Sequence, residues 1–139
     1  MAAERAQDRA QRLARIVKVQ EQLHRAEERR LADIQERFDR LRQDETDLIA
    51  LLNSEDGLAG LFMDATVNRL RSVSEQQIAT ALERQAQMQV VLDTGSRLKA
   101  AEKLLGEAER AASREAEQSQ LAEATERLSW QAPGKILGS

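Results

Sequence analysis

The 139-residue chain is 32% charged and only 2% aromatic, and it contains no cysteine. So few aromatic side chains exclude a thick globular core, whereas the abundant Ala, Leu, Glu, Gln and Arg are strong helix formers. The 21 basic and 24 acidic residues are interspersed and give a net charge of −3, which excludes a basic surface for nucleic acid, and the lack of cysteine excludes disulfides and thiolate metal sites.

The segment 2–52 contains neither Gly nor Pro, and its apolar side chains recur at steps of three and four residues. This spacing aligns them along one face of a helix as a heptad seam, the line of contact between two helices of a coiled coil. The apolar pattern requires one extra four-residue step near Glu27. The predicted seam is Leu13, Ile16, Gln20, Leu23, Glu27, Leu31, Ile34, Phe38, Leu41, Glu45, Leu48 and Leu52.

Three members of this seam, Gln20, Glu27 and Glu45, are polar and lower its stability. Two interpretations stay open. Their polar ends reach water at the edge of a thin interface, or they specify the pairing register or a surface for a third helix.

The sequence Asn53-Ser54-Glu55-Asp56-Gly57 interrupts the helical pattern. Asn and Gly readily adopt the backbone conformations that end helices, and Ser and Asp cap the start of a following helix. We therefore predict a turn at residues 53–57. A short turn between amphipathic helices favours an antiparallel hairpin over the alternative, one uninterrupted helix in a parallel dimer.

Helical periodicity resumes at Leu58 and continues to Trp130, with Gly95 placed near the seam, where it would allow close approach of the other helix. Pro133 disfavours helix in the residue before it. The sequence therefore predicts a second helix over residues 58–130 and an irregular tail over residues 131–139.

A hairpin closed at this turn sets residues opposite each other whose numbers add to about 113, so that Leu31 faces Leu82 and Leu41 faces Val73. The segment 112–130 then has no partner within the chain. The predicted fold is all-α: a long antiparallel two-helix coiled-coil hairpin over residues 1–130, with a C-terminal helical overhang.

The sequence offers no grouping of residues typical of catalysis. His24 is the only histidine and has no Cys or second His to complete a metal site, so we interpret it as a flanking residue of the first helix. General acid–base chemistry needs titratable groups that converge in a partly dry pocket, and two paired helices supply none. We expect no catalytic residue, no metal and no cofactor, and hence no enzyme.

Partner binding is the better hypothesis, at two places. Apolar residues crowd the turn, where they either close the hairpin end as a local cluster or dock a partner, and the unpaired overhang keeps a helical pattern that a partner helix or a second copy of the chain would cover. The tail after Trp130 is either disordered or a docking motif. The partner-binding candidates are Leu58, Leu61, Phe62, Met63, Ala112, Ala116, Leu128 and Trp130.

The whole pattern, an Arg/Glu-rich first helix, one turn and a longer second helix over residues 2–130, resembles the FliJ/YscO-type stalk proteins of flagellar and virulence type III export. The resemblance implies a cytoplasmic coiled coil, similar to the γ stalk of rotary ATPases, that inserts into a hexameric export ATPase, contacts the export gate and escorts chaperones. It carries over no individual residue. The alternative is a self-assembling structural or scaffolding coiled coil unrelated to export. The polar N-terminal sequence and the lack of a long apolar segment fit a protein without membrane insertion.

Overall fold

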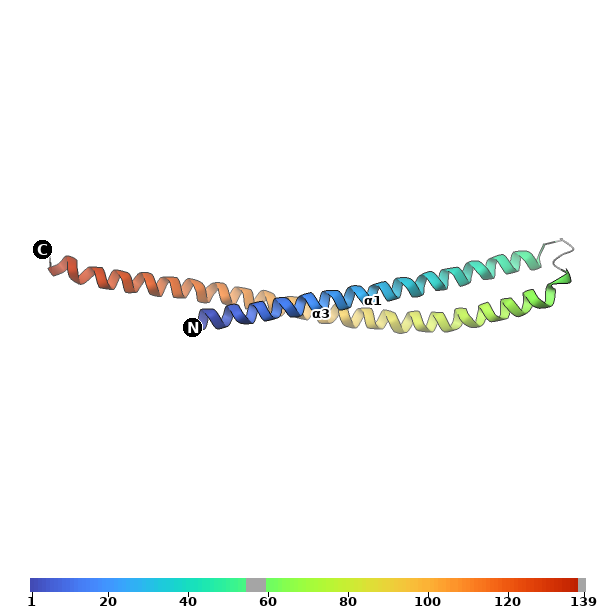
Figure 1. The fold of residues 1–139 in the computed structure, drawn as a ribbon, viewed down its shortest axis with the longest axis horizontal. Helices are drawn as coiled ribbons and strands as arrows, with labels where there is room; N and C mark the ends of the chain where they lie inside the picture. Colours follow the sequence, from blue (N-terminus) through green and yellow to red (C-terminus); the bar gives the residue numbers. More distant parts are fainter. Residues whose placement is uncertain (55–59, 138–139) are drawn as a thin grey trace. The chain divides into compact units, whose positions relative to one another are not determined.

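The computed structural model describes the backbone of residues 1–54 and 60–137 and the side chains up to Trp130. It contains two long helices, α1 (Ala2–Leu52) and α3 (Met63–Leu137), which pack against each other in antiparallel directions (Figure 1). Across the described residues there is no β-strand. The predicted all-α helical hairpin is therefore confirmed.

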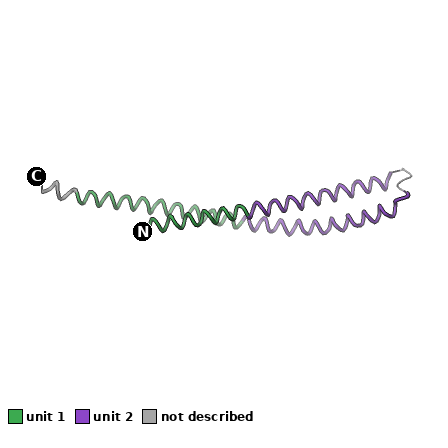
Figure 2. The backbone as a smooth tube through the Cα atoms, viewed as in Figure 1, with its two compact units in different colours: residues 1–22, 96–139 green, residues 23–95 purple. Residues whose placement is uncertain are grey.

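The chain divides into two compact units (Figure 2). Unit 1 comprises residues 1–22 and 96–139, and unit 2 comprises residues 23–95. In each unit a stretch of α1 packs against a stretch of α3, so each has its own interface between two helices.

The buried side of α1 follows a single heptad frame without interruption, so the predicted extra step near Glu27 is wrong. Val17 is 7% exposed, whereas its predicted counterpart Ile16 is 48% exposed. The predicted seam contained the larger apolar residues Ile16 and Leu23. In the structure Val17 and His24 occupy these two positions of the seam. The seam of α1 is Ala3, Ala6, Ala10, Leu13, Val17, Gln20, His24, Glu27, Leu31, Ile34, Phe38, Leu41, Glu45, Leu48 and Leu52.

The seam of α3 also keeps one frame, but its composition changes along the helix. In unit 2 most of its members are polar, and Val73 is the one large side chain that is fully buried among the described residues. In unit 1 the seam is Leu and Ala as far as Ala112. Its members are Thr66, Leu70, Val73, Gln77, Thr80, Arg84, Gln87, Val91, Thr94, Leu98, Ala101, Leu105, Ala108, Ala112 and Glu115.

The pairing register differs from the predicted one by about five residues. His24 contacts Thr94, and Gln77 contacts Leu41, so the numbers of facing residues add to about 118. Leu82 does not face Leu31; it is 65% exposed. The prediction matched large apolar residues with one another, whereas hydrogen bonds between polar seam residues set the observed pairing.

The second long helix begins later in the sequence than predicted. α1 ends at Leu52, as expected, where the Asn53 N–H donates to the Ile49 carbonyl at 3.0 Å. α3 begins at Met63 rather than at residue 58, and the Thr66 N–H and hydroxyl both donate to the Phe62 carbonyl at its start. Of the predicted turn, residues 55–57 lie outside the described residues, as does Leu58.

The predicted irregular tail is wrong for residues 131–137, because α3 continues through Pro133 to Leu137. A proline inside a helix removes one backbone hydrogen bond and crowds the preceding turn, but it does not forbid helix beyond it. Residues 138 and 139 lie outside the described residues.

We predict that Val73→Asp and Leu31→Asp each lower the free energy of unfolding by about 2 kcal/mol or more, because each places a charge in the seam of unit 2. Glu36→Ala, at an exposed position of α1, should change it by less than about 0.5 kcal/mol. Urea unfolding followed by circular dichroism measures both effects. Equal effects of all three substitutions would contradict the assigned seam.

Candidate partner-binding surfaces

The polar seam of unit 2 is a network of hydrogen bonds between the two helices. The Gln87 amide donates to the Glu27 carboxylate at 2.6 Å and to the Glu27 backbone carbonyl at 3.0 Å. The Gln77 amide donates to the Leu41 carbonyl at 3.1 Å. Among the described residues, no buried side-chain nitrogen or oxygen lacks a partner. Of the two interpretations of Glu27, register specification is therefore the better one, because its carboxylate is held by the opposite helix.

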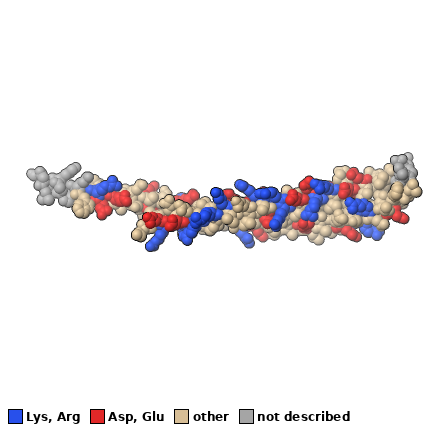
Figure 3. Space-filling model, viewed as in Figure 1, with Lys and Arg blue, Asp and Glu red and all other residues tan. Residues whose placement is uncertain are grey.

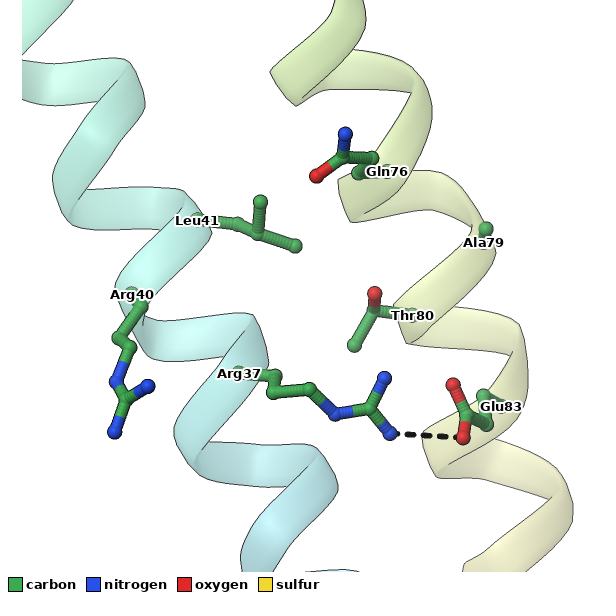
Figure 4. Close-up of a pocket in the computed structure, with 7 residues that line it drawn as sticks. All are labelled: Arg37, Arg40, Leu41, Gln76, Ala79, Thr80 and Glu83. Carbon is green, nitrogen blue, oxygen red and sulfur yellow. Dashed lines mark hydrogen bonds and ion pairs between the residues drawn. The ribbon is translucent and has the colours of Figure 1, made fainter.

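Two arginines extend this network from opposite sides of the interface. Arg84 of α3 donates to the Gln35 amide oxygen at 3.2 Å, and its guanidinium lies 4.4 Å from the centre of the Phe38 ring. Arg37 of α1 reaches across to Glu83 at 2.9 Å, over a shallow groove into which Leu41 projects (Figure 4). Both members of the Arg37–Glu83 pair are about half exposed, so this ion pair orients the two helices more than it stabilises the fold.

His24, predicted to be a flanking residue, instead occupies the seam and contacts α3. Its Nδ1 lies 2.8 Å from the Thr94 hydroxyl, and its Nε2 lies 2.7 Å from the Glu28 carboxylate one turn along α1. Gly95 provides the room for the ring, because a Cβ at that position would lie 3.2 Å from His24 Cε1. The expectation that Gly95 allows close approach is confirmed.

The hydrogen bonds around His24 can be satisfied in two ways that differ by one proton. An ionised Glu28 carboxylate only accepts, so Nε2 donates to it. If the Thr94 hydroxyl donates to the Val91 carbonyl, which is 3.1 Å away, then Nδ1 must also donate and the ring is a cation. If the hydroxyl donates to Nδ1 instead, a neutral ring is sufficient. Thr94 can therefore accommodate either form.

The apolar residues just before and at the first residue of α3 are exposed together. Leu61, Phe62 and Met63 are consecutive, and each exposes at least half of its surface. Leu58 lies outside the described residues.

The candidates near the end of α3 separate into paired and unpaired residues. Ala112 is half-buried in the seam of unit 1, so it belongs to the interface with α1. Ala116 and all residues from there to Trp130 are exposed, and Leu128 and Trp130 are 67% and 81% exposed. The unpaired overhang therefore begins at residue 116, not at residue 112, because the shifted register pairs four more residues with α1.

Charge is distributed over the visible face without a large region of one sign (Figure 3). Many pairs form within a helix, such as Glu36 with Arg40 at 2.6 Å and Glu123 with Arg127 at 3.9 Å. Over the described part of the chain, no cluster of three or more His, Cys, Asp or Glu side chains could hold a metal ion.

Neither described helix has a stretch both long and apolar enough to cross a membrane. The chain matches no family model, no curated protein and no solved structure. The surfaces themselves therefore carry the functional argument.

Sequence reasoning missed the contacts of His24, Gln77, Arg84 and Gln87 across the interface. A regular heptad spacing, applied through the polar positions of both helices, places these four residues in the interface. The predicted seam instead followed the larger apolar residues.

We predict that Gly95→Ala and Gly106→Ala have different effects on stability. Alanine exceeds glycine in helix propensity by roughly 1 kcal/mol. At Gly106 a Cβ meets only the Arg110 guanidinium at 3.5 Å, an ordinary contact, so most of that gain should appear. At Gly95 the His24 ring must move, so the gain should be reduced or reversed.

Thermal unfolding of both variants tests this difference. As a control, Gly95→Ala in a His24→Ala background should recover the full stabilisation. If Gly95→Ala stabilises the chain equally with and without His24, the close packing of the ring carries no energetic weight.

Proposed function

We propose that this chain is a non-enzymatic protein-interaction module whose overhang, residues 116–137 of α3, binds a helix of another protein. The observation that carries the proposal is the exposure of every side chain from Ala116 to Trp130 along a continuous helix. An isolated helix of this length is only marginally stable in water. Coverage by a partner would supply the missing burial.

The overhang carries an apolar stripe suited to this role. Leu121, Ala124 and Leu128 follow steps of three and four, so they lie on one face of the helix. Leu121 and Leu128 are each 67% exposed, which leaves two large side chains available to a partner. Apolar residues at this spacing are the usual anchors by which one amphipathic helix binds another protein.

Within this class we propose a cytoplasmic stalk of a type III export apparatus, with a hexameric export ATPase as the partner of the overhang and the export gate as a further partner. The support is the resemblance of the chain to FliJ/YscO-type proteins together with its hairpin fold and exposed helical extension. The exposed residues Leu61, Phe62 and Met63 would serve a separate partner, such as a chaperone.

A self-assembling structural coiled coil is the second candidate function. It is favoured by exposed apolar residues on the outer face of α3 in unit 2, Ile78, Leu82 and Leu92. Self-assembly and partner binding would use different parts of α3, so one does not exclude the other.

We predict that Leu121→Asp/Leu128→Asp weakens capture of a purified hexameric export ATPase by at least about tenfold, because each substitution places a charge in an apolar contact. The melting temperature should stay nearly unchanged, since both residues are exposed. The matched control is Leu61→Asp/Phe62→Asp, which alters two exposed apolar residues elsewhere and should retain binding. Pull-down with the full-length chain is the measurement.

Three results would contradict parts of this proposal. Failure of the unmodified chain to capture the ATPase would reject the export stalk. Loss of binding only in the Leu61/Phe62 variant would move the binding surface to the start of α3. A large drop in melting temperature for the Leu121/Leu128 variant would show that these residues pack within the chain.

A further inference from the structure

The residues that immediately precede a seam residue lie along one edge of the helix pair, on α1 and on α3 alike. In unit 2 such residues of both helices line a common groove. They include Arg30, Arg37, Glu83, Ala86 and Val90. The seam of each helix keeps one frame, so the same rule identifies the corresponding edge of unit 1 (green in Figure 2). We call the residues of unit 1 that immediately precede a seam residue the basic edge.

The basic edge combines positive charge with exposed apolar side chains. It contains five arginines, one acidic residue (Glu107) and three large apolar residues, and its other members are alanine. Ile16, Val19 and Leu104 are 48%, 53% and 45% exposed, so the packing of α1 on α3 leaves about half of each in contact with solvent. The arginines are Arg5, Arg9, Arg12, Arg97 and Arg114.

The opposite edge of unit 1, formed by the residues that immediately follow a seam residue, has a different composition. Over its described members, which lie in residues 4–21 and 99–116, it contains no large apolar residue. It carries two lysines and four glutamates, which are Glu4, Glu21, Glu102 and Glu109. Solubility requires charges of both signs on any face, so it does not account for arginines and apolar residues gathered on one edge.

The arginines of the basic edge differ from those of unit 2 in their partners. Arg37 and Arg40, on the corresponding edge of unit 2, pair with Glu83 and Glu36. Within the described part of the chain, none of the five arginines of the basic edge forms an ion pair. Their charge is therefore available to carboxylates of another molecule.

The pairing register places the apolar residues in the middle of the basic edge. Because the numbers of facing residues add to about 118, Leu104 of α3 lies close to the level of Ile16 of α1. By the same register, Arg97 follows Val19 along the edge, and Arg12 precedes Ile16. Arginines thus flank an apolar centre on both sides.

We propose that the basic edge of unit 1 binds an acidic amphipathic helix of another protein. Apolar side chains of that helix cover Ile16, Val19 and Leu104, and its carboxylates pair with the arginines on either side. Guanidinium groups suit this role because they donate two parallel hydrogen bonds to one carboxylate. The apolar centre supplies burial, and the arginines supply orientation and a fast rate of association.

The composition of the basic edge favours a helix over a nucleic acid. Phosphates would meet the arginines but would leave the three large apolar residues exposed. An edge built from two helices presents side chains at steps of three and four, which is the spacing of the apolar anchors on an amphipathic helix.

Binding of two designed peptides to the full-length chain, followed by fluorescence anisotropy, tests the proposal. The first is an amphipathic helix of about 21 residues with leucine at steps of three and four and glutamate beside it. The second carries lysine in place of each glutamate. The chain should bind the acidic peptide at least about tenfold more tightly than the lysine peptide, and added salt should weaken that binding. Equal affinity for the two peptides, or no binding of the acidic one, would overturn the proposal.

Charge reversal locates the binding surface. Arg9→Glu/Arg12→Glu should weaken binding of the acidic peptide by at least about tenfold. The matched control is Arg15→Glu/Arg110→Glu, which makes the same change in net charge at two exposed arginines of unit 1 that lie outside the basic edge. It should weaken binding by less than about threefold, and both variants should keep their helicity by circular dichroism. Equal losses of affinity in the two variants would show that only net charge matters.

Three further measurements separate other occupants of the basic edge. Ile16→Ser/Val19→Ser should also weaken binding of the acidic peptide, and an unchanged affinity would overturn the role of the apolar centre. Displacement of the peptide by duplex DNA at a lower concentration than by unlabelled peptide would assign the edge to nucleic acid instead. A dimer in sedimentation equilibrium that Arg9→Glu/Arg12→Glu converts to monomer would make a second copy of the chain the occupant.

This inference is independent of the proposed function, because the basic edge ends at Arg114 and the overhang begins at Ala116. Leu121→Asp/Leu128→Asp should leave binding of the acidic peptide unchanged even where ATPase capture is lost. Loss of peptide binding in that variant would show that the overhang, and not the basic edge, holds the peptide.

Discussion

The pairing register of α1 and α3 in unit 2 depends on hydrogen bonds between polar seam residues. The buried apolar area changes little when one helix is displaced along the other by a heptad, because the seam positions of the two helices still face each other. The contacts of Gln87 with Glu27 and of His24 with Thr94 are different, since displacement would leave their polar groups unpaired in a partly dry interface. These contacts select one alignment.

The heptad frame of α3 decides which of its residues face α1. It directs Gln77, Arg84 and Gln87 to α1, which leaves Ile78, Leu82 and Leu92 on the outside. A helix that packs polar residues inward and exposes apolar ones departs from the usual amphipathic arrangement. Its result is a face of α3 in unit 2 that is apolar and that α1 does not cover.

Unit 1 is built differently from unit 2. Its seam on α3 is Leu and Ala as far as Ala112, with Ala101 and Ala108 buried, so small and apolar side chains fill most of this interface. The pairing ends at Glu115, where the partner segment of α1 reaches its first residues. The helix beyond it gains nothing from α1, and Leu121 and Leu128 stay exposed.

The two long helices and the end of α1 at Leu52 followed from the sequence alone, because helix propensity and local spacing determine them. The register, the seam position of His24 and the start of the overhang at residue 116 did not. They depend on which polar groups of one helix find partners on the other. That pairing is a property of two segments distant in sequence, and periodicity within either segment does not encode it. The helix through Pro133 was missed for a related reason: a local preference was treated as decisive where the continuing backbone could tolerate the loss of one hydrogen bond.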